Sequence, residues 1–207
     1  DGLGGWTDQG DNDLRALPNG RIQISGLPFM ITDNAMVLSD GRIPAWPGRA
    51  EVEAIDRHGT CLYLLHAAAW APQTETSVGQ MTLAFADGSS EVRDIRSQRD
   101  VADWWNPVDH LDNARLGWSS ENPQASVGLF VTRIAIPDRP LRSLTCTAVG
   151  GAVWMVCGLA IGEDVPLPVS TQAQDTLVED ARWRPTPVTW EGEPGSAAQL
   201  AVTEPVY

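Results

Sequence analysis

Two adjacent tryptophans stand in a short segment that is typical of a loop, Asp103-Trp104-Trp105-Asn106-Pro107. An indole combines a flat apolar face with a polar N–H edge, which suits the C–H face and hydroxyl rim of a sugar ring. Packing is the alternative, because neighbouring side chains of an extended segment point to opposite faces and one indole could then fill a core. The sequence leaves both interpretations of the pair open.

The other tryptophans divide by their context. Trp46 and Trp118 lie in polar, turn-rich segments, whereas Trp70 and Trp154 belong to apolar runs and are expected in a core. If the polar loops meet at one end of the fold, their indoles would form an aromatic surface with a hydrogen-bonding rim. The candidate ligand-binding residues are then Trp46, Arg99, Asp103, Trp104, Trp105, Asn106 and Trp118.

Acidic residues near the tryptophan pair raise the question of catalysis. A glycosidase needs two carboxyls at a defined separation, and a lyase needs a base beside a charge neutraliser. Aspartate is also the usual capping and turn residue of loops, and the chain has neither a Gly-x-Ser-x-Gly elbow nor a phosphate-binding loop. Asp100, Asp103, Asp109, His110 and Asp112 could in principle supply such carboxyl and imidazole groups. Because no catalytic motif accompanies them, we predict no catalytic residue.

A second acidic group near the start of the chain has the chemistry of a calcium site. Calcium takes six to eight oxygen ligands from carboxylates, amides and backbone carbonyls. A turn with capping carboxylates is the alternative. The predicted ligands are Asp8, Asp11, Asn12 and Asp13, and Glu163 and Asp164 could complete the site. Zinc is not expected, because the three histidines are scattered, and His66 within an apolar run is predicted to be a hydrogen-bonded core residue.

Composition limits the partners. Asp and Glu number 27 against 14 Arg and Lys, giving a net charge of −13 that disfavours nucleic acid and an anionic membrane surface. No apolar run approaches the length of a membrane span. The chain starts at Asp1 without a visible targeting signal, as expected for a segment of a longer protein. The cysteines at 61, 146 and 157 lie in apolar runs, so buried thiols are favoured over a bridge between Cys146 and Cys157.

The elements that would position these residues read as strands separated by Gly, Pro and Asn turns. Residues 61–69 are almost wholly apolar and predict a central strand buried on both faces. Asp87-Gly88 predicts a hairpin between strands 81–86 and 91–95, and Gly150-Gly151 predicts a second one between 141–149 and 152–161. Further strands are expected over 21–24, 26–31, 51–55 and 127–136.

This pattern predicts an all-β protein, a jelly-roll β-sandwich of two antiparallel sheets over residues 1–162. Residues 163–207 hold six of the fifteen prolines and are mostly polar and acidic, so we expect an extended C-terminal tail or linker. Its short apolar runs and its two tryptophans could also dock on the sandwich or on a neighbouring domain or subunit.

Several segments carry a resemblance to a known family. They are Trp6-Thr7-Asp8-Gln9-Gly10, Asn12-Asp13-Leu14-Arg15, Leu62-Tyr63-Leu64-Leu65-His66-Ala67, Ala86-Asp87-Gly88 and Asp103-Trp104-Trp105, in this order. From residue 5 to about 162 the chain resembles the galactose-binding-like jelly-roll accessory modules attached to bacterial glycoside hydrolases and related secreted polysaccharide-degrading proteins. One departure is Pro137-Asp138-Arg139-Pro140, where such modules often have Asn-Pro before the last hairpin.

The resemblance implies a sandwich of two antiparallel sheets, often with a structural calcium, that binds glycans through loops at one end or does not bind them at all. It implies a secreted location, extracellular or periplasmic. We therefore expect a noncatalytic carbohydrate-binding or accessory module of a larger protein. The alternative from another class is a structural module, whose tryptophans and tail contact other domains or identical subunits.

Overall fold

A computed structural model describes residues 14–53, 55–121, 125–168, 176–177, 182–190 and 199–204. One 3-10 turn, η1 (Leu14–Ala16), is followed by β-strands. These are β1 (Gly20–Ile24), β2 (Leu27–Ile31), β3 (Met36–Ser39), β4 (Arg49–Val52), β5 (Cys61–Ala69), β6 (Ser77–Phe85), β7 (Ser90–Arg96), β8 (Ala114–Glu121), β9 (Ser126–Ala135), β10 (Leu141–Ala148), β11 (Val153–Gly162), β12 (Thr176–Leu177), β13 (Arg182–Trp190) and β14 (Gln199–Glu204).

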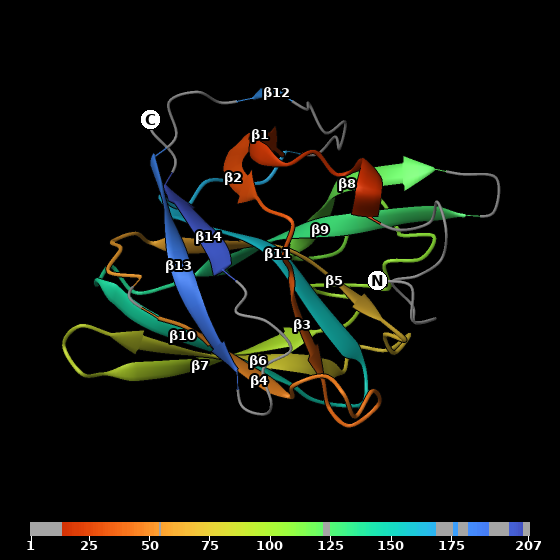
Figure 1. The fold of residues 1–207 in the computed structure, drawn as a ribbon, viewed down its shortest axis with the longest axis horizontal. Helices are drawn as coiled ribbons and strands as arrows, with labels where there is room; N and C mark the ends of the chain where they lie inside the picture. The colour runs from red at the N-terminus through yellow and green to blue at the C-terminus, as the bar shows by residue number, and fades with distance from the viewer. Residues whose placement is uncertain are drawn as a thin grey trace.

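The strands form an all-β sandwich of antiparallel sheets, which confirms the predicted fold class. One sheet has the order β7-β6-β10-β4, and the sheet packed against it has the order β11-β5-β9-β8 with β3 beside β11. The chain crosses between the two sheets several times, as in jelly-roll and other Greek-key sandwiches. Figure 1 shows a further layer, in which the β1–β2 hairpin lies over the outer side of the β11-β5-β9-β8 sheet.

Two apolar cores separate these three layers. The first lies between the large sheets and contains Trp154, while the second lies between the outer face of the β5–β11 sheet and the β1–β2 hairpin. All nine residues of β5 are buried: Leu64 enters the first core and its neighbour Leu65 enters the second. The prediction of a strand buried on both faces is confirmed, and the β11-β5-β9-β8 sheet is the middle of the three layers.

The predicted hairpin around Gly150-Gly151 is wrong. β10 pairs with β4 and β6, whereas β11 pairs with β3 and β5, so the two strands belong to different sheets. The glycines instead carry the chain across the sandwich with φ angles of 74° and 75°. A Cβ on Gly150 would lie 2.6 Å from the carbonyl oxygen of Ser77, so this crossing requires glycine. The sequence pattern located both strands and the turn between them, but it does not specify which strands β10 and β11 pair with.

The hairpin around Asp87-Gly88 is confirmed as β6 and β7. The N–H of Ser89 donates to Oδ1 of Asp87 over 2.9 Å, and Gly88 has a φ of 85°. Strands β3 and β8 were not predicted from the sequence. The predicted tail contributes β12, β13 and β14, whose backbones pair with β1, β4 and β11 respectively. The boundary at residue 162 stays a prediction.

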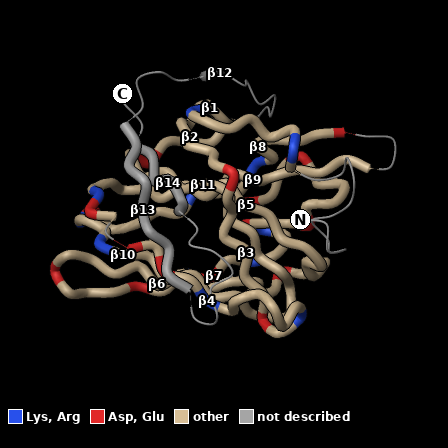
Figure 2. Tube along the Cα trace, viewed as in Figure 1, with Lys and Arg blue, Asp and Glu red and all other residues tan. Residues whose placement is uncertain are grey.

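Charged residues lie mainly in loops and outer strands (Figure 2). Arg139, for example, bonds Asp87 over 3.2 Å and Glu91 over 3.0 Å. Strands β5 and β11 contain no Asp, Glu, Lys or Arg, consistent with their place in the middle layer. Among the described residues, no helix has the length and apolar character needed to cross a membrane.

Candidate functional site

A pocket of about 690 Å³ opens on the outer face of the middle sheet, beside the β1–β2 hairpin. Its floor is apolar and contains the sulfur-bearing side chains Met155 and Cys157 of β11 together with Val37 of β3. Met155 pairs in register with Val37, so the two side chains project from the same face of the sheet. The full lining is Leu14, Arg15, Leu17, Asn19, Ile31, Thr32, Asp33, Asn34, Ala35, Val37, Trp104, Met155 and Cys157.

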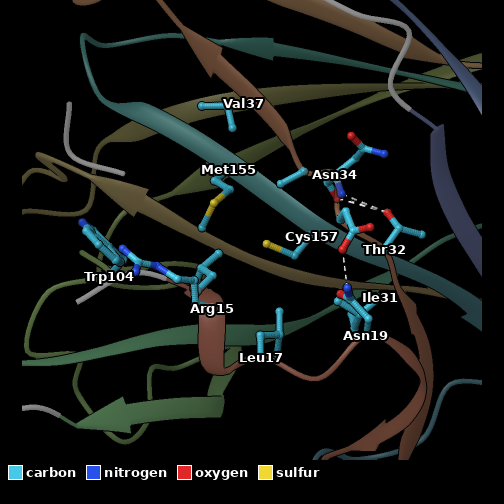
Figure 3. Close-up of a pocket in the computed structure, with 13 residues that line it drawn as sticks. Arg15, Leu17, Asn19, Ile31, Thr32, Asn34, Val37, Trp104, Met155 and Cys157 are labelled. Atoms are coloured by element: carbon cyan, nitrogen blue, oxygen red, sulfur yellow. Dashed lines mark hydrogen bonds between the residues drawn. The ribbon is translucent and has the colours of Figure 1, made fainter. Parts of the chain in front are cut away.

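The two ends of the pocket differ in chemistry. Figure 3 shows Trp104 at one end and the polar side chains of Asn19, Thr32 and Asn34 at the other, with the two sulfur atoms between them. The side-chain amide of Asn19 donates to the carboxylate of Asp33. The pocket therefore joins an aromatic end to an end rich in hydrogen-bonding groups over an apolar floor.

The polar end is formed by the connection between β2 and β3. Thr32 follows the last residue of β2, and its hydroxyl accepts the N–H of Asn34 over 3.2 Å. This bond folds the four residues before Met36 into a turn, which leaves Asp33 and Asn34 exposed at the rim. Sequence reasoning missed this rim, because a Thr-Asp-Asn run after a strand indicates only a turn.

The aromatic end is held by backbone bonds on both sides of Trp104. Its N–H donates to the carbonyl of Ala68 over 2.8 Å, and its own carbonyl accepts the N–H of Gly128 over 2.9 Å. The carboxylate of Asp103 accepts the N–H groups of Trp105 and Ala71 over 3.0 and 3.1 Å. Asp103 was predicted to contact a ligand, yet both of its oxygens are used to fix this loop.

Trp104 is both a core residue and a pocket residue. It is only 3% exposed and belongs to the second core, while lining the pocket with its accessible part. Its ring centroid lies 5.8 Å from that of Trp105 at an interplanar angle of 63°, an edge-to-face contact. Trp105 is half-buried against the same core, so both indoles pack, and a role of the pair in ligand binding stays a prediction.

The remaining predicted aromatic residues also pack on the second core. Trp118 lies in β8 and is 4% exposed, so its predicted polar, flexible setting is wrong. The apolar cluster of the second core recruits it because β8 pairs along β9. Trp46 is half-buried against this core. The four indoles therefore share one apolar cluster, but of the four only Trp104 lines the pocket.

The predicted polar contacts Arg99 and Asn106 do not line the pocket either. The Arg99 guanidinium lies 3.9 Å from Glu75 and 3.7 Å from Asp100. The Asn106 side-chain oxygen accepts the N–H of Ser126 over 3.3 Å, at a residue whose φ is 47°. Their contacts hold loops in place.

Trp70 was predicted to be a core residue, and this prediction is wrong. It follows directly after β5 and is 47% exposed. Its φ of 54° turns the chain out of the strand, so the indole leaves the alternation that buries its neighbours. No sequence signal distinguishes it from the apolar run that precedes it.

Of the groups considered for catalysis, Asp100 and Asp103 hold backbone N–H groups, whereas Asp109, His110 and Asp112 are exposed. The buried carboxylate of Asp100 accepts the backbone N–H of Arg96 over 2.9 Å and the side-chain amide of Asn113 over 2.8 Å. His66 is fully buried and hydrogen-bonded, as predicted, with Thr132 at 2.7 Å. Burial lowers the pKa of His66 from its ordinary 6.5 to about 3, so the ring is neutral at physiological pH.

The predicted calcium ligands Asp8, Asp11 and Asp13, with Asn12, lie outside the described residues. Glu163 is exposed and its backbone carbonyl accepts the Tyr63 hydroxyl over 2.7 Å. The carboxylate of Asp164 bonds the Arg133 guanidinium, which holds its pKa below the usual range. Within the part of the chain that the structure describes, no group of three His, Cys, Asp or Glu side chains could hold a metal ion. Calcium stays a prediction.

The three cysteines are free and buried, as predicted. Cys146 belongs to the first core, whereas Cys61 and Cys157 belong to the second. Burial raises the pKa of the Cys157 thiol to about 12 and that of Cys61 to about 11. Comparison of the chain with protein-family models, with curated proteins and with solved structures returned no match.

Proposed function

We propose that the protein is a noncatalytic carbohydrate-binding module and that the pocket between β1–β2 and β3 is its sugar site. The observation that carries this proposal is the distribution of chemistry along the pocket, with an indole at one end, hydroxyl, amide and carboxylate groups at the other, and an apolar floor between them. A pyranose ring presents the same combination, because its C–H face is apolar and its hydroxyl rim donates and accepts hydrogen bonds.

The polar groups at the rim are suited to sugar hydroxyls. A carboxylate accepts hydroxyl protons, while an asparagine amide both donates and accepts. Asp33 and Asn34 are exposed at the rim, and Asn19 orients the Asp33 carboxylate. The exposed Arg15 adds a donor next to the aromatic end. The pocket volume lies within the range of small-molecule sites.

A larger extracellular or periplasmic glycan-active protein is the setting that we propose for this module. Within such a protein, a site without catalytic groups holds the polymer near an active domain. Calcium bound at Asp8, Asp11, Asp13 and Glu163 would support the fold and would take no part in sugar binding.

The test is calorimetric titration of the purified chain with neutral and acidic saccharides, with and without calcium. Asn34→Ala removes an exposed rim amide, and Val37→Phe places a ring over the pocket floor, so both should weaken binding while the melting temperature changes little. Val92→Ala is the matched control, because Val92 is 55% exposed on β7 and does not line the pocket. Saccharide binding that is equal in all four proteins would place the site elsewhere, and no binding at all would reject the proposal.

A structural module is the second candidate, favoured by the pairing of β13 with β4 and of β14 with β11. Through these pairs the segment after residue 163 connects the edges of the two large sheets, and such a segment could do the same between subunits. Light scattering of the full chain distinguishes the two candidates. A concentration-independent monomer that binds sugar supports the first, and an oligomer that binds none supports the second.

A further inference from the structure

Trp70 is an exposed tryptophan whose indole belongs to neither apolar core. Its side chain is 47% exposed, and the other large apolar side chains exposed in the described part of the chain are Val92 and Val108. Tryptophan is enriched at contacts with other macromolecules, where its apolar ring and its polar N–H are both used.

The backbone at Trp70 is strained in a way that keeps the indole outside the core. Its φ of 54° lies in the left-handed region, which disfavours a bulky residue. The conformation is fixed from both sides, because the carbonyl of Ala68 accepts the N–H of Trp104 and the N–H of Ala71 donates to the Asp103 carboxylate over 3.1 Å. Glycine or asparagine would suit this backbone better, so the tryptophan is retained against a local cost.

A guanidinium is held against this indole. The Cζ atom of Arg42 lies 5.1 Å from the Trp70 ring centroid, and Arg42 Nε donates to the carbonyl of Gly151. Cation–π contact orients the ring, and the remaining guanidinium N–H groups provide donors next to an exposed aromatic face. An aromatic face beside fixed donors is the arrangement that a sugar ring recognises.

We propose that Trp70 and Arg42 form a second sugar-binding position that continues the pocket, so that the ligand is a chain of several sugar units and not a single terminal sugar. This inference rests on the proposed function of the pocket. It assigns the ligand class, an oligosaccharide or polysaccharide, and it assigns the direction in which the chain leaves the pocket, past Trp104.

The segments that carry the two positions are hydrogen-bonded to each other. Trp104 lines the pocket, and its N–H bonds the residue two positions before Trp70 over 2.8 Å. Asp103, which precedes Trp104, bonds the residue directly after Trp70. The two indoles therefore lie on adjacent segments that are bonded to each other at two points, as required for neighbouring positions along one bound chain.

The experiment is calorimetric titration with neutral β-linked oligosaccharides of one to about six units, using the wild-type chain, Trp70→Gly and Val92→Ala. Trp70→Gly removes the aromatic face and relieves the positive φ. We expect it to lower the affinity for the longest oligosaccharide roughly tenfold. The affinity for the monosaccharide should stay unchanged, and the melting temperature should stay the same or rise. Trp70→Phe should recover part of the lost affinity, and Val92→Ala should match the wild type.

The outcomes separate this inference from the proposed function. If the wild type binds saccharides at the pocket with an affinity that does not grow with chain length, or if Trp70→Gly binds the longest oligosaccharide as the wild type does, the second position is rejected and the pocket stands. If Asn34→Ala and Val37→Phe bind saccharides as the wild type does while Trp70→Gly does not, the pocket is rejected. Absence of any binding rejects both.

Discussion

The indole Nε1–H of Trp154 donates to Nδ1 of His66 over 3.0 Å in the core between the two large sheets. Because Nδ1 accepts, the ring proton resides on Nε2, which faces the Thr132 hydroxyl at 2.7 Å and the Asp100 carbonyl at 3.2 Å. Every polar atom of the two rings is thereby bonded. The bonds link β11, β5 and β9 to the segment that carries Asp100, and two predictions follow from this geometry.

His66 should make the stability of the fold depend on pH. Burial lowers its pKa to about 3 in the folded chain, whereas in the unfolded chain it stays near 6.5. As the pH falls below about 6.5, His66 is protonated in the unfolded state but stays neutral in the folded state. The fold therefore loses stability as the pH falls from 6.5 toward 3. We expect the free energy of unfolding in urea to drop by roughly 2 kcal/mol between about pH 7 and pH 5.

His66→Gln is the control for this titration. The variant should be less stable at neutral pH, because the Trp154 bond is altered, but its stability should change much less between the same two pH values. An equal pH dependence in both proteins would show that other groups are responsible.

Gly79 should not accept a side chain, because Trp154 is held against it. A Cβ at this position would lie 2.5 Å from Cε3 of the Trp154 ring, which is fully buried and tied to His66. Gly79→Ala should cost about 1–3 kcal/mol of unfolding free energy, measured in urea. Gly48→Ala is the comparison, since the nearest atom to its Cβ would be the Ser39 carbonyl oxygen at 3.5 Å, and it should change stability by less than about 0.5 kcal/mol. Equal effects of the two substitutions would contradict the contact.

Trp104→Ala should destabilise the fold, so its stability has to be measured before its ligand binding is interpreted. The side chain is 3% exposed in the second core, so its removal should cost about 3–5 kcal/mol. Trp105→Ala should cost less, because that indole is only half-buried. Urea unfolding and near-UV circular dichroism of both variants provide the measurement. Near-native stability of Trp104→Ala would show that the indole is not a core residue.

The thiols should be inert in the folded protein. Burial raises the pKa of all three, to about 11 for Cys61 and about 12 for Cys157, and the thiolate is the form that reacts. Iodoacetamide at pH 8, followed by mass spectrometry, should label none of them within minutes in buffer and all three in urea. Cys157 lines the pocket and should be the first to react on long exposure. Rapid labelling of Cys146 would contradict its place in the first core.

The sequence predicted the elements of this fold better than their partners. The apolar run of β5 and the Asp87-Gly88 turn carry local signals, periodicity and turn chemistry, and both were located correctly. The partner of β10 depends on contacts distant in the sequence, which no local pattern encodes, and the hairpin predicted with β11 was wrong. β3 was missed because four residues are too short to show a period.

The candidate site divides in the same way. Trp104 was selected from its residue type and its loop, and it does line the pocket. The polar rim at Thr32 to Asn34 becomes adjacent to it only when β2 and β3 pack beside β11, so it could not be found from spacing. Trp70 was assigned to the core because it continues an apolar run, and a single positive φ reverses that assignment.

The middle layer has a consequence for how the chain finds its alignment during folding. A strand buried on one face is held in register by its alternation, because a slip of one residue would expose the apolar side chains. β11 is buried on both faces, so that penalty is absent. Its alignment with β5 instead includes a one-residue shift between Val156 and Gly158, with Cys157 as the extra residue. A Cβ on Gly158 would lie 3.0 Å from the Phe29 ring, so the hairpin above the sheet closes only over this glycine. The irregular position thus fixes the register of β11 against β5, and an insertion or deletion beside it should misalign the two strands.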